Sequence, residues 1–96
     1  MKSKQISDLA TLLKSISHPF RLQILCLLQD KEMTVGELSK AIKTTDANVS
    51  QHLSILRHQG IITTRKESNF IYNRLIDDRV TRLIETMQGL FCNIEE

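Results

Sequence analysis

TTDANVSQHLSILRHQG, residues 44–60, is the stretch that decides the fold of this chain. Its apolar side chains recur close to the helical period and predict an amphipathic helix with one buried stripe, formed by Ala47, Val49, Leu53 and Leu56. Thr44 or Thr45 can cap the start of this helix, because a short side-chain oxygen accepts from the first free backbone N–H groups. Gly60 stands where a residue in the left-handed conformation commonly ends a helix.

The opposite face of the predicted helix is polar, and Asp46 at its start is the one acid in the stretch. This face offers amide, hydroxyl, imidazole and guanidinium groups from Asn48, Ser50, Gln51, His52, Ser54, Arg57 and His58. An ordinary solvated helix mixes Glu with Lys, whereas a helix in the DNA major groove needs such groups to meet base edges and phosphates. We therefore interpret the stretch as a recognition helix. Taken alone, it leaves an ordinary amphipathic surface helix open as the alternative.

The residues before this stretch predict a short helix that starts near Met33. Thr34 and Glu37 have the spacing of a capping box, in which each side chain bonds to the backbone N–H of the other residue. The expected buried face of this helix consists of Val35, Leu38, Ala41 and Ile42. Residues 43–45 then form a short turn. Two short helices joined in this way, the second with a polar outer face, form a helix-turn-helix.

After Gly60 the pattern changes to a period of two. Residues 61–66 and 70–75 are rich in β-branched and aromatic side chains, and residues 67–69 have turn chemistry, so we predict a β-hairpin. A hairpin directly after a helix-turn-helix is the wing of a winged helix. We expect its tip to reach backbone phosphates or a minor groove through Arg65, Lys66 and Asn69. A hairpin tip that is basic by chance and merely solvated is the alternative.

Helices are also predicted toward both ends of the chain. Residues 6–17 carry an apolar face, residues 19–30 form a central buried helix that begins at Pro19, and a last helix opens at Asp77 and Asp78. A chain of this length has little left to cover the apolar stripes of the first and last helices, so we expect them to form a dimer interface. A two-fold dimer would place two recognition helices about 34 Å apart and would favour a pseudo-palindromic operator.

The 96 residues fit a single domain, 1–96, of the α+β class with mostly helical structure. The net charge of +2 is too small to indicate a partner. The longest apolar run, residues 24–28, is too short to span a bilayer, and no signal sequence follows the N-terminus, so a cytoplasmic protein is expected. We find no nucleophile–base spacing, glycine-rich phosphate loop or carboxylate pair, and therefore expect neither an enzyme nor a cofactor.

Several segments resemble those of the ArsR/SmtB family of bacterial winged-helix repressors. The similar segments are residues 18–25 (HPFRLQIL), 34–38 (TVGEL), 50–62 (SQHLSILRHQGII) and 66–72. This resemblance covers nearly the whole chain. It implies a homodimer that occupies an operator in double-stranded DNA until a signal, bound or sensed elsewhere in the protein, releases it.

The usual metal sites of that family are not expected here. Its thiolate site uses a Cys-Val-Cys motif in the third helix, where this chain has Thr34, Val35 and Gly36. Its other site uses carboxylates and histidines on the last helix, and residues 79–96 contain no histidine. His18 is expected to be a helix-start residue, and we assign no metal ligand.

The positions of Cys26 and Cys92 resemble the HlyU/BigR-type branch of the family, in which cysteines on the second and last helices form a redox or reactive-sulfur switch. The resemblance implies that oxidation or persulfide bridging of this pair controls the affinity for DNA. Simple core packing is the alternative for Cys26, because cysteine is a common small core residue.

Our hypothesis is a DNA-binding regulator, more specifically a repressor, with contacts to DNA from Thr45, Asn48, Ser50, Gln51, His52, Arg57, Arg65, Lys66 and Asn69. Two alternatives stay open. One is a metal-responsive repressor with an unusual site built from Cys26, Cys92, Glu95 or Glu96. The other is a winged-helix module used only for association with proteins.

Overall fold

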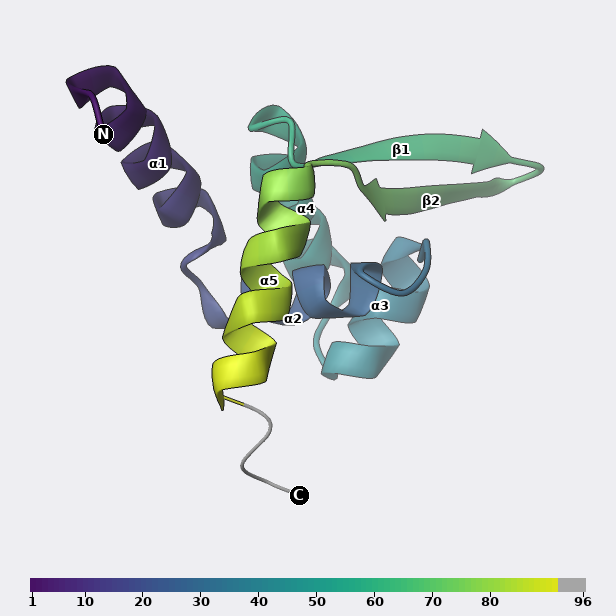
Figure 1. The fold of residues 1–96 in the computed structure, drawn as a ribbon. Coiled ribbons are helices and arrows are strands. Elements are labelled where there is room, and N and C mark those ends of the chain that lie inside the picture. Colours follow the sequence, from purple (N-terminus) through teal and green to yellow (C-terminus); the bar gives the residue numbers. More distant parts are fainter. Residues whose placement is uncertain (92–96) are drawn as a thin grey trace.

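The computed structural model describes residues 1–91, which form a mostly helical body with one β-hairpin (Figure 1). The elements follow in the order α1 (Ser3–Ile16), α2 (Pro19–Leu28), α3 (Val35–Ile42), α4 (Asp46–His58), β1 (Ile62–Glu67), β2 (Phe70–Leu75) and α5 (Asp78–Phe91). This order confirms the predicted winged helix-turn-helix. The predicted ends of the first two helices were inexact, since α1 begins before residue 6 and α2 ends before residue 30.

The hydrophobic core lies where α2 packs against α3, α4, α5 and the base of the hairpin. Its fully buried members include Ile24 and Leu25 of α2 and Ile84 of α5. The apolar stripe of α4 is buried as predicted at Val49, Leu53 and Leu56, but Ala47 is exposed. The prediction for Ala47 was wrong because this position, three and four residues before the exposed Ser50 and Gln51, lies on the outer face of the helix.

The helix-turn-helix is set by local backbone interactions at its turn. The capping box of α3 is formed, with Glu37 N–H donating to the Thr34 hydroxyl over 3.1 Å and Thr34 N–H donating to the Glu37 carboxylate over 2.9 Å. Lys43 ends α3 in the left-handed conformation with φ 66°, and the N–H groups of Lys43 and Thr44 both donate to the carbonyl of Ser39. This tight turn directs the chain into α4.

Strands β1 and β2 pair antiparallel, with Ile62 opposite Leu75 at the base and Glu67 opposite Phe70 at the tip. The first strand therefore lies one residue later than predicted, and the turn consists of residues 68–69. Ser68 has a positive φ of 58° in this turn. Two-residue loops of this kind need such a conformation to match the twist of the flanking strands.

A single-residue bridge fastens the base of the hairpin to the segment between α2 and α3. Met33 pairs with Asn73, the two backbones exchange N–H···O bonds of 2.8 and 3.1 Å, and the Asn73 amide donates to the same Met33 carbonyl. Met33 was predicted to begin the third helix and instead forms this bridge. The hairpin is thus attached to the helical body through β1, which continues from α4, and through β2, which pairs with Met33.

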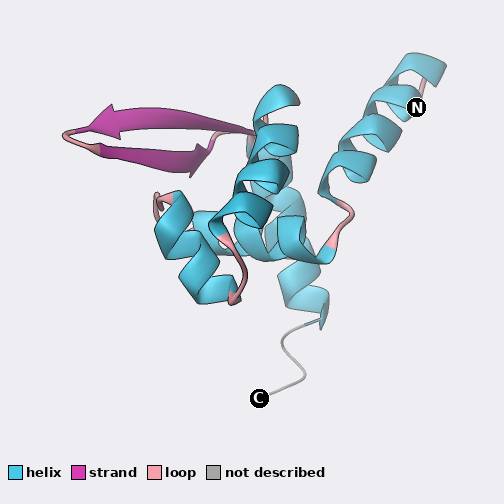
Figure 2. Ribbon diagram, turned by 180° about the vertical axis from the view of Figure 1, so that it is seen from behind, coloured by secondary structure: helices cyan, strands magenta, loops and turns pink. Residues whose placement is uncertain are grey.

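Helix α1 projects from the body on the side away from the hairpin, as both ribbon views show (Figures 1 and 2). Only its last two residues, Ser15 and Ile16, are buried. The apolar face predicted for the first helix is therefore largely exposed within one chain. Among residues 1–91 we find no helix with the length and apolar character that a membrane span requires.

Candidate nucleic-acid interface

The outward face of α4 is a continuous polar surface. Ser50, Gln51, Ser54, Arg57 and His58 are all exposed, and none of their side chains forms a hydrogen bond or ion pair within the part of the chain that is described. Ala47 lies on the same side at the N-terminal end. A small apolar side chain there permits close approach to a base and suits contact with a thymine methyl group. The surface has the composition that base-edge and phosphate contacts require.

The start of α4 is held by the helix-turn-helix itself. The Thr45 hydroxyl accepts from Asn48 N–H over 3.1 Å, and the Asn48 amide donates to the Thr44 hydroxyl over 3.1 Å. Asp46 accepts a short hydrogen bond from the Ser39 hydroxyl of α3. The single carboxylate of the stretch is therefore engaged with α3, which leaves the exposed α4 surface free of acids.

His52 lies apart from the other predicted DNA contacts. Its ring is partly buried against α2, with its centroid 4.3 Å from that of His18 and 5.7 Å from that of Phe20. Its Nδ1 lies 3.1 Å from Nη1 of Arg21. Burial, then the nearby His18 and Arg21, hold the pKa of His52 below its ordinary value. The geometry gives this ring an intramolecular role that the sequence did not indicate.

Arg65 is also engaged within the chain, although it was predicted to contact DNA. Its Nε donates to Glu32 over 2.6 Å, its Nη1 donates to Glu67 over 2.5 Å, and its guanidinium lies over the ring of Tyr72. These two carboxylates raise the pKa of Arg65. Any phosphate that this side chain contacts would compete with two carboxylates.

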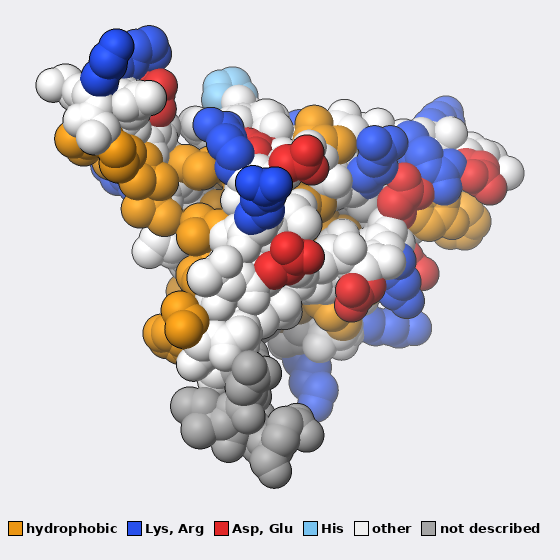
Figure 3. Space-filling model, viewed as in Figure 1, with side chains coloured by type: hydrophobic (Ala, Val, Ile, Leu, Met, Phe, Trp, Pro, Cys, Tyr) orange, Lys and Arg blue, Asp and Glu red, His pale blue; other side chains and the backbone are white. Residues whose placement is uncertain are grey.

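Lys66 and Asn69 are exposed near the tip of the wing, without a hydrogen-bond partner in residues 1–91. The space-filling view shows basic and acidic side chains mixed along the wing, with an apolar patch at its tip (Figure 3). Phe70 and Ile71 are each more than half exposed there. Of the two basic wing side chains predicted to contact DNA, Lys66 is therefore the one that no carboxylate engages among residues 1–91.

Cys26 lies on the half-buried side of α2 and lines an apolar pocket of about 230 Å³ between α2 and α5. The walls of this pocket are Leu22, Cys26, Ile84, Met87, Gln88 and Phe91. Cys92, the other predicted redox residue, lies outside the described residues and directly follows Phe91 in sequence. Cys26 also lines a second pocket of about 510 Å³ between α2 and α3, so the pocket toward α5 is one of two that this side chain borders.

A metal site is not formed by residues 1–91, in which no group of three or more His, Cys, Asp or Glu side chains could hold an ion. The alternative site that also uses Cys92, Glu95 and Glu96 falls on residues that are not described.

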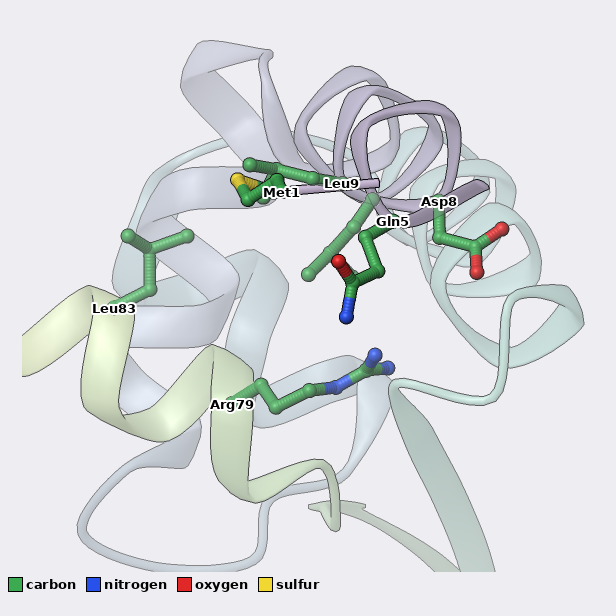
Figure 4. Close-up of a pocket in the computed structure, with 7 residues that line it drawn as sticks. Met1, Gln5, Asp8, Leu9, Arg79 and Leu83 are labelled. Carbon is green, nitrogen blue, oxygen red and sulfur yellow. The ribbon is translucent and has the colours of Figure 1, made fainter. Parts of the chain in front are cut away.

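A cleft of about 330 Å³ separates α1 from α5 (Figure 4). Leu9 and Leu83 face it from the two helices, and Arg79 extends across it toward Gln5. Arg79 also donates to the Asp77 carboxylate over 2.7 Å, which lowers the pKa of Asp77. The apolar face of α1 and the end of α5 remain uncovered in the isolated chain.

Comparison with known proteins agrees with this geometry. Residues 18–64 match the family described as "Bacterial regulatory protein, arsR family". The biofilm growth-associated repressor of Agrobacterium fabrum is 41% identical over 97% of this chain and 80% of its own length. The transcriptional activator HlyU of Vibrio cholerae is 38% identical over 97% of this chain and 86% of its own length.

Solved structures show the same fold. The structure of reduced HlyU from Vibrio cholerae has a TM-score of 0.89 and 39% identity, covering 93% of this chain and 94% of that one. A homodimeric winged helix-turn-helix DNA-binding domain, Mb0332 from Mycobacterium bovis, has a TM-score of 0.80 and 26% identity, covering 94% of this chain and 86% of that one.

The chain belongs to the arsR family of bacterial regulatory proteins. It is a DNA-binding transcriptional regulator of the HlyU and biofilm-repressor type, and not an enzyme.

Proposed function

We propose that the protein is a homodimeric repressor that binds a pseudo-palindromic operator through α4 and the wing and is controlled by its two thiols. The observation that carries the DNA-binding part is the exposed α4 surface, where Ser50, Gln51 and Arg57 have no partner among the described residues. Because Asp46 is engaged with Ser39, no carboxylate on this face opposes a phosphate. Binding to chromosomal DNA would place its action in the cytoplasm.

The support for a dimer comes from the terminal helices. Leu90 and Phe91 at the end of α5 are 67% and 75% exposed, and Ile6 and Leu13 of α1 are also exposed. Large neighbouring apolar side chains rarely stay in water and mark association surfaces. The Mycobacterium bovis relative is a homodimer of the same fold. Docking a second copy against α1 and α5 would leave both α4 surfaces free for DNA.

Replacing Leu13 with Glu tests the dimer. The side chain is 41% exposed, so the isolated fold should tolerate the charge, whereas an apolar interface should not. We expect sedimentation equilibrium to shift toward the monomer and the affinity for a two-half-site duplex to fall. Leu13→Met is the matched control. A dimer of unchanged strength in the Leu13→Glu variant would contradict this placement of the interface.

The support for thiol control is the position of Cys26. One of the two pockets that it lines is bounded by α5, and Phe91 on the wall of this pocket immediately precedes Cys92 in sequence. A bond between the two sulfurs would link α2 to the chain beyond α5. Two thiols would release two protons and two electrons to an oxidant as the sulfur–sulfur bond forms. Such a link would shift α5. In a dimer this shift would change the distance between the two α4 helices that bind the two half-sites.

The decisive experiment measures DNA binding by fluorescence anisotropy before and after treatment with tetrathionate, which accepts the two electrons and leaves as thiosulfate. The probe is the duplex upstream of the protein's own gene, and intact mass reports the bridge. We expect tetrathionate to lower the affinity for DNA and to reduce the intact mass by two hydrogens, and dithiothreitol to reverse both changes. The affinities of the Cys26→Ser and Cys92→Ser variants should not respond to tetrathionate. Unchanged affinity of the bridged protein would show that the cysteines do not control binding.

A further inference from the structure

Two histidines far apart in the sequence meet where α2 begins and where α4 crosses it. His18 caps α2, and its Nδ1 accepts from Phe20 N–H over 3.1 Å. The centroid of its ring lies 4.3 Å from that of His52 on α4. Since a backbone N–H can only donate, the Nδ1 of His18 must carry a lone pair and no proton.

Arg21 connects this pair to α1. Its Nε donates to the carbonyl of Ser15, in the last turn of α1, over 2.6 Å. Its Nη1 lies 3.1 Å from Nδ1 of His52. A guanidinium only donates, so Nδ1 of His52 accepts and is also unprotonated. One side chain therefore joins the end of the first helix, the second helix and the helix that presents Gln51 to DNA.

We propose that His18 and Arg21 are positioning residues for DNA binding, which hold α4 at its docking angle through the neutral ring of His52, and that proton uptake by His52 weakens binding. This proposal rests on the proposed function, because it assumes that α4 enters the groove. It assigns His52 to the support of α4 in place of the direct contact expected from the sequence.

Protonation is incompatible with the observed contacts. A proton on Nδ1 of His52 would face the N–H of Arg21, so two donors and two cations would stand 3.1 Å apart. Burial lowers the pKa of His52, and the titratable and charged groups that face its ring, His18 and Arg21, lower it further. When the contact between Arg21 and His52 is broken, the pKa of His52 returns to its ordinary value. Low pH therefore favours the conformation in which this contact is broken and His52 is protonated.

The direction in which DNA affinity changes with pH distinguishes a His52 that positions α4 from a His52 that contacts DNA directly. If His52 contacted a phosphate, its protonation would add a positive charge at the interface and strengthen binding. If it positions α4 as a neutral acceptor, protonation weakens binding. An ordinary histidine titrates at about pH 6.5, and the contact holds the pKa of His52 below that value, so lowering the pH to about 5.5 should weaken affinity by at most about tenfold for each protomer.

The experiment is fluorescence anisotropy at about pH 7.5 and 5.5 and constant ionic strength, with the reduced protein and the duplex upstream of its own gene. The quantity compared is the ratio of the two affinities within each variant. We expect a ratio above one in the wild type, up to about ten for each protomer, and a ratio near one in His52→Asn, whose amide oxygen can accept from Arg21 without titrating. Gln23→Asn, at an exposed position of α2 outside α4 and the wing, is the control and should keep the wild-type ratio.

A second variant tests the positioning role without pH. Arg21→Met should lower the affinity at about pH 7.5 and leave the slope of log affinity against log salt unchanged, because no phosphate contact is lost. A slope flattened by about one unit would instead make Arg21 a phosphate contact and overturn the assignment. Wild-type affinity in this variant, or affinity that is flat or rises in acid in the wild type, would also overturn it. Absence of binding by the wild type at about pH 7.5 would refute the proposed function itself.

Discussion

Replacing Gln51 and Lys66 separately with alanine should produce two different kinds of loss. Both side chains are exposed and neither has a hydrogen-bond partner within residues 1–91, so each substitution should change folding stability by less than about 0.5 kcal/mol. The whole effect should therefore appear in DNA binding. Gln51 can bond to a base edge in two places, whereas we assign Lys66, near the tip of the wing, to a phosphate.

The magnitudes follow from these two chemistries. A bidentate amide contact discriminates against a wrong base by about 1–3 kcal/mol, so Gln51→Ala should weaken operator binding by roughly 5- to 150-fold per half-site. It should barely change binding to a scrambled duplex. Lys66→Ala should weaken both duplexes alike and reduce the salt slope by about 0.9 per protomer.

The assay is fluorescence anisotropy on operator and scrambled duplexes at several salt concentrations. Gln23→Ala on α2 and Lys14→Ala on α1 are the matched controls, since both residues are exposed and lie outside α4 and the wing. Equal losses on the two duplexes for Gln51→Ala, or an unchanged salt slope for Lys66→Ala, would refute the roles assigned to these side chains.

Three further predictions concern the fold that presents this surface. Lys43→Gly should raise the free energy of unfolding by about 1 kcal/mol relative to Lys43→Ala in urea titrations, because φ is 66° there. Thr45→Ala should lower the free energy of unfolding by about 1 kcal/mol, since Asn48 N–H loses the hydroxyl that accepts its hydrogen bond. Thr45→Ser should restore most of this loss. The pKa of Asp77 is lowered chiefly by the hydrogen bonds from Arg79, so its stabilising effect should be present at neutral pH and be lost as pH falls below the ordinary value of a carboxyl. The melting temperature of Asp77→Asn should consequently vary less with acid than that of the wild type.

Features that depend on neighbouring residues could be predicted from the sequence. The buried stripe at Val49, Leu53 and Leu56, the cap at Thr45 and the left-handed Gly60 all depend on spacings of a few residues. Such signals arise from helical periodicity and backbone hydrogen bonding, which act before the chain packs. The expectation for Ala47 failed because its apolar character does not say which neighbour, if any, covers it.

Features that depend on packing could not be predicted. His52 and Arg21 are 31 positions apart, and Arg65 and Glu32 are 33 apart, so nothing in either local sequence shows that they meet. From the sequence, His52 and Arg65 were both polar groups available for DNA. Only the fold shows that each already has a partner within the chain. Met33 likewise forms a strand of one residue, which has no periodicity to detect.

The bridge between Met33 and Asn73 has an evolutionary consequence. It fixes the base of the hairpin to the helical body, and Arg65 adds a second tie to Glu32 farther out, so residues beyond these points contribute little to the stability of the domain. Substitutions, and even changes of length, at residues 67–71 are then free to accumulate without altering the pose of α4. If α4 and the wing bind DNA as proposed, their two contributions to operator recognition can diverge independently, and a new preference at the wing can arise while that of α4 is retained.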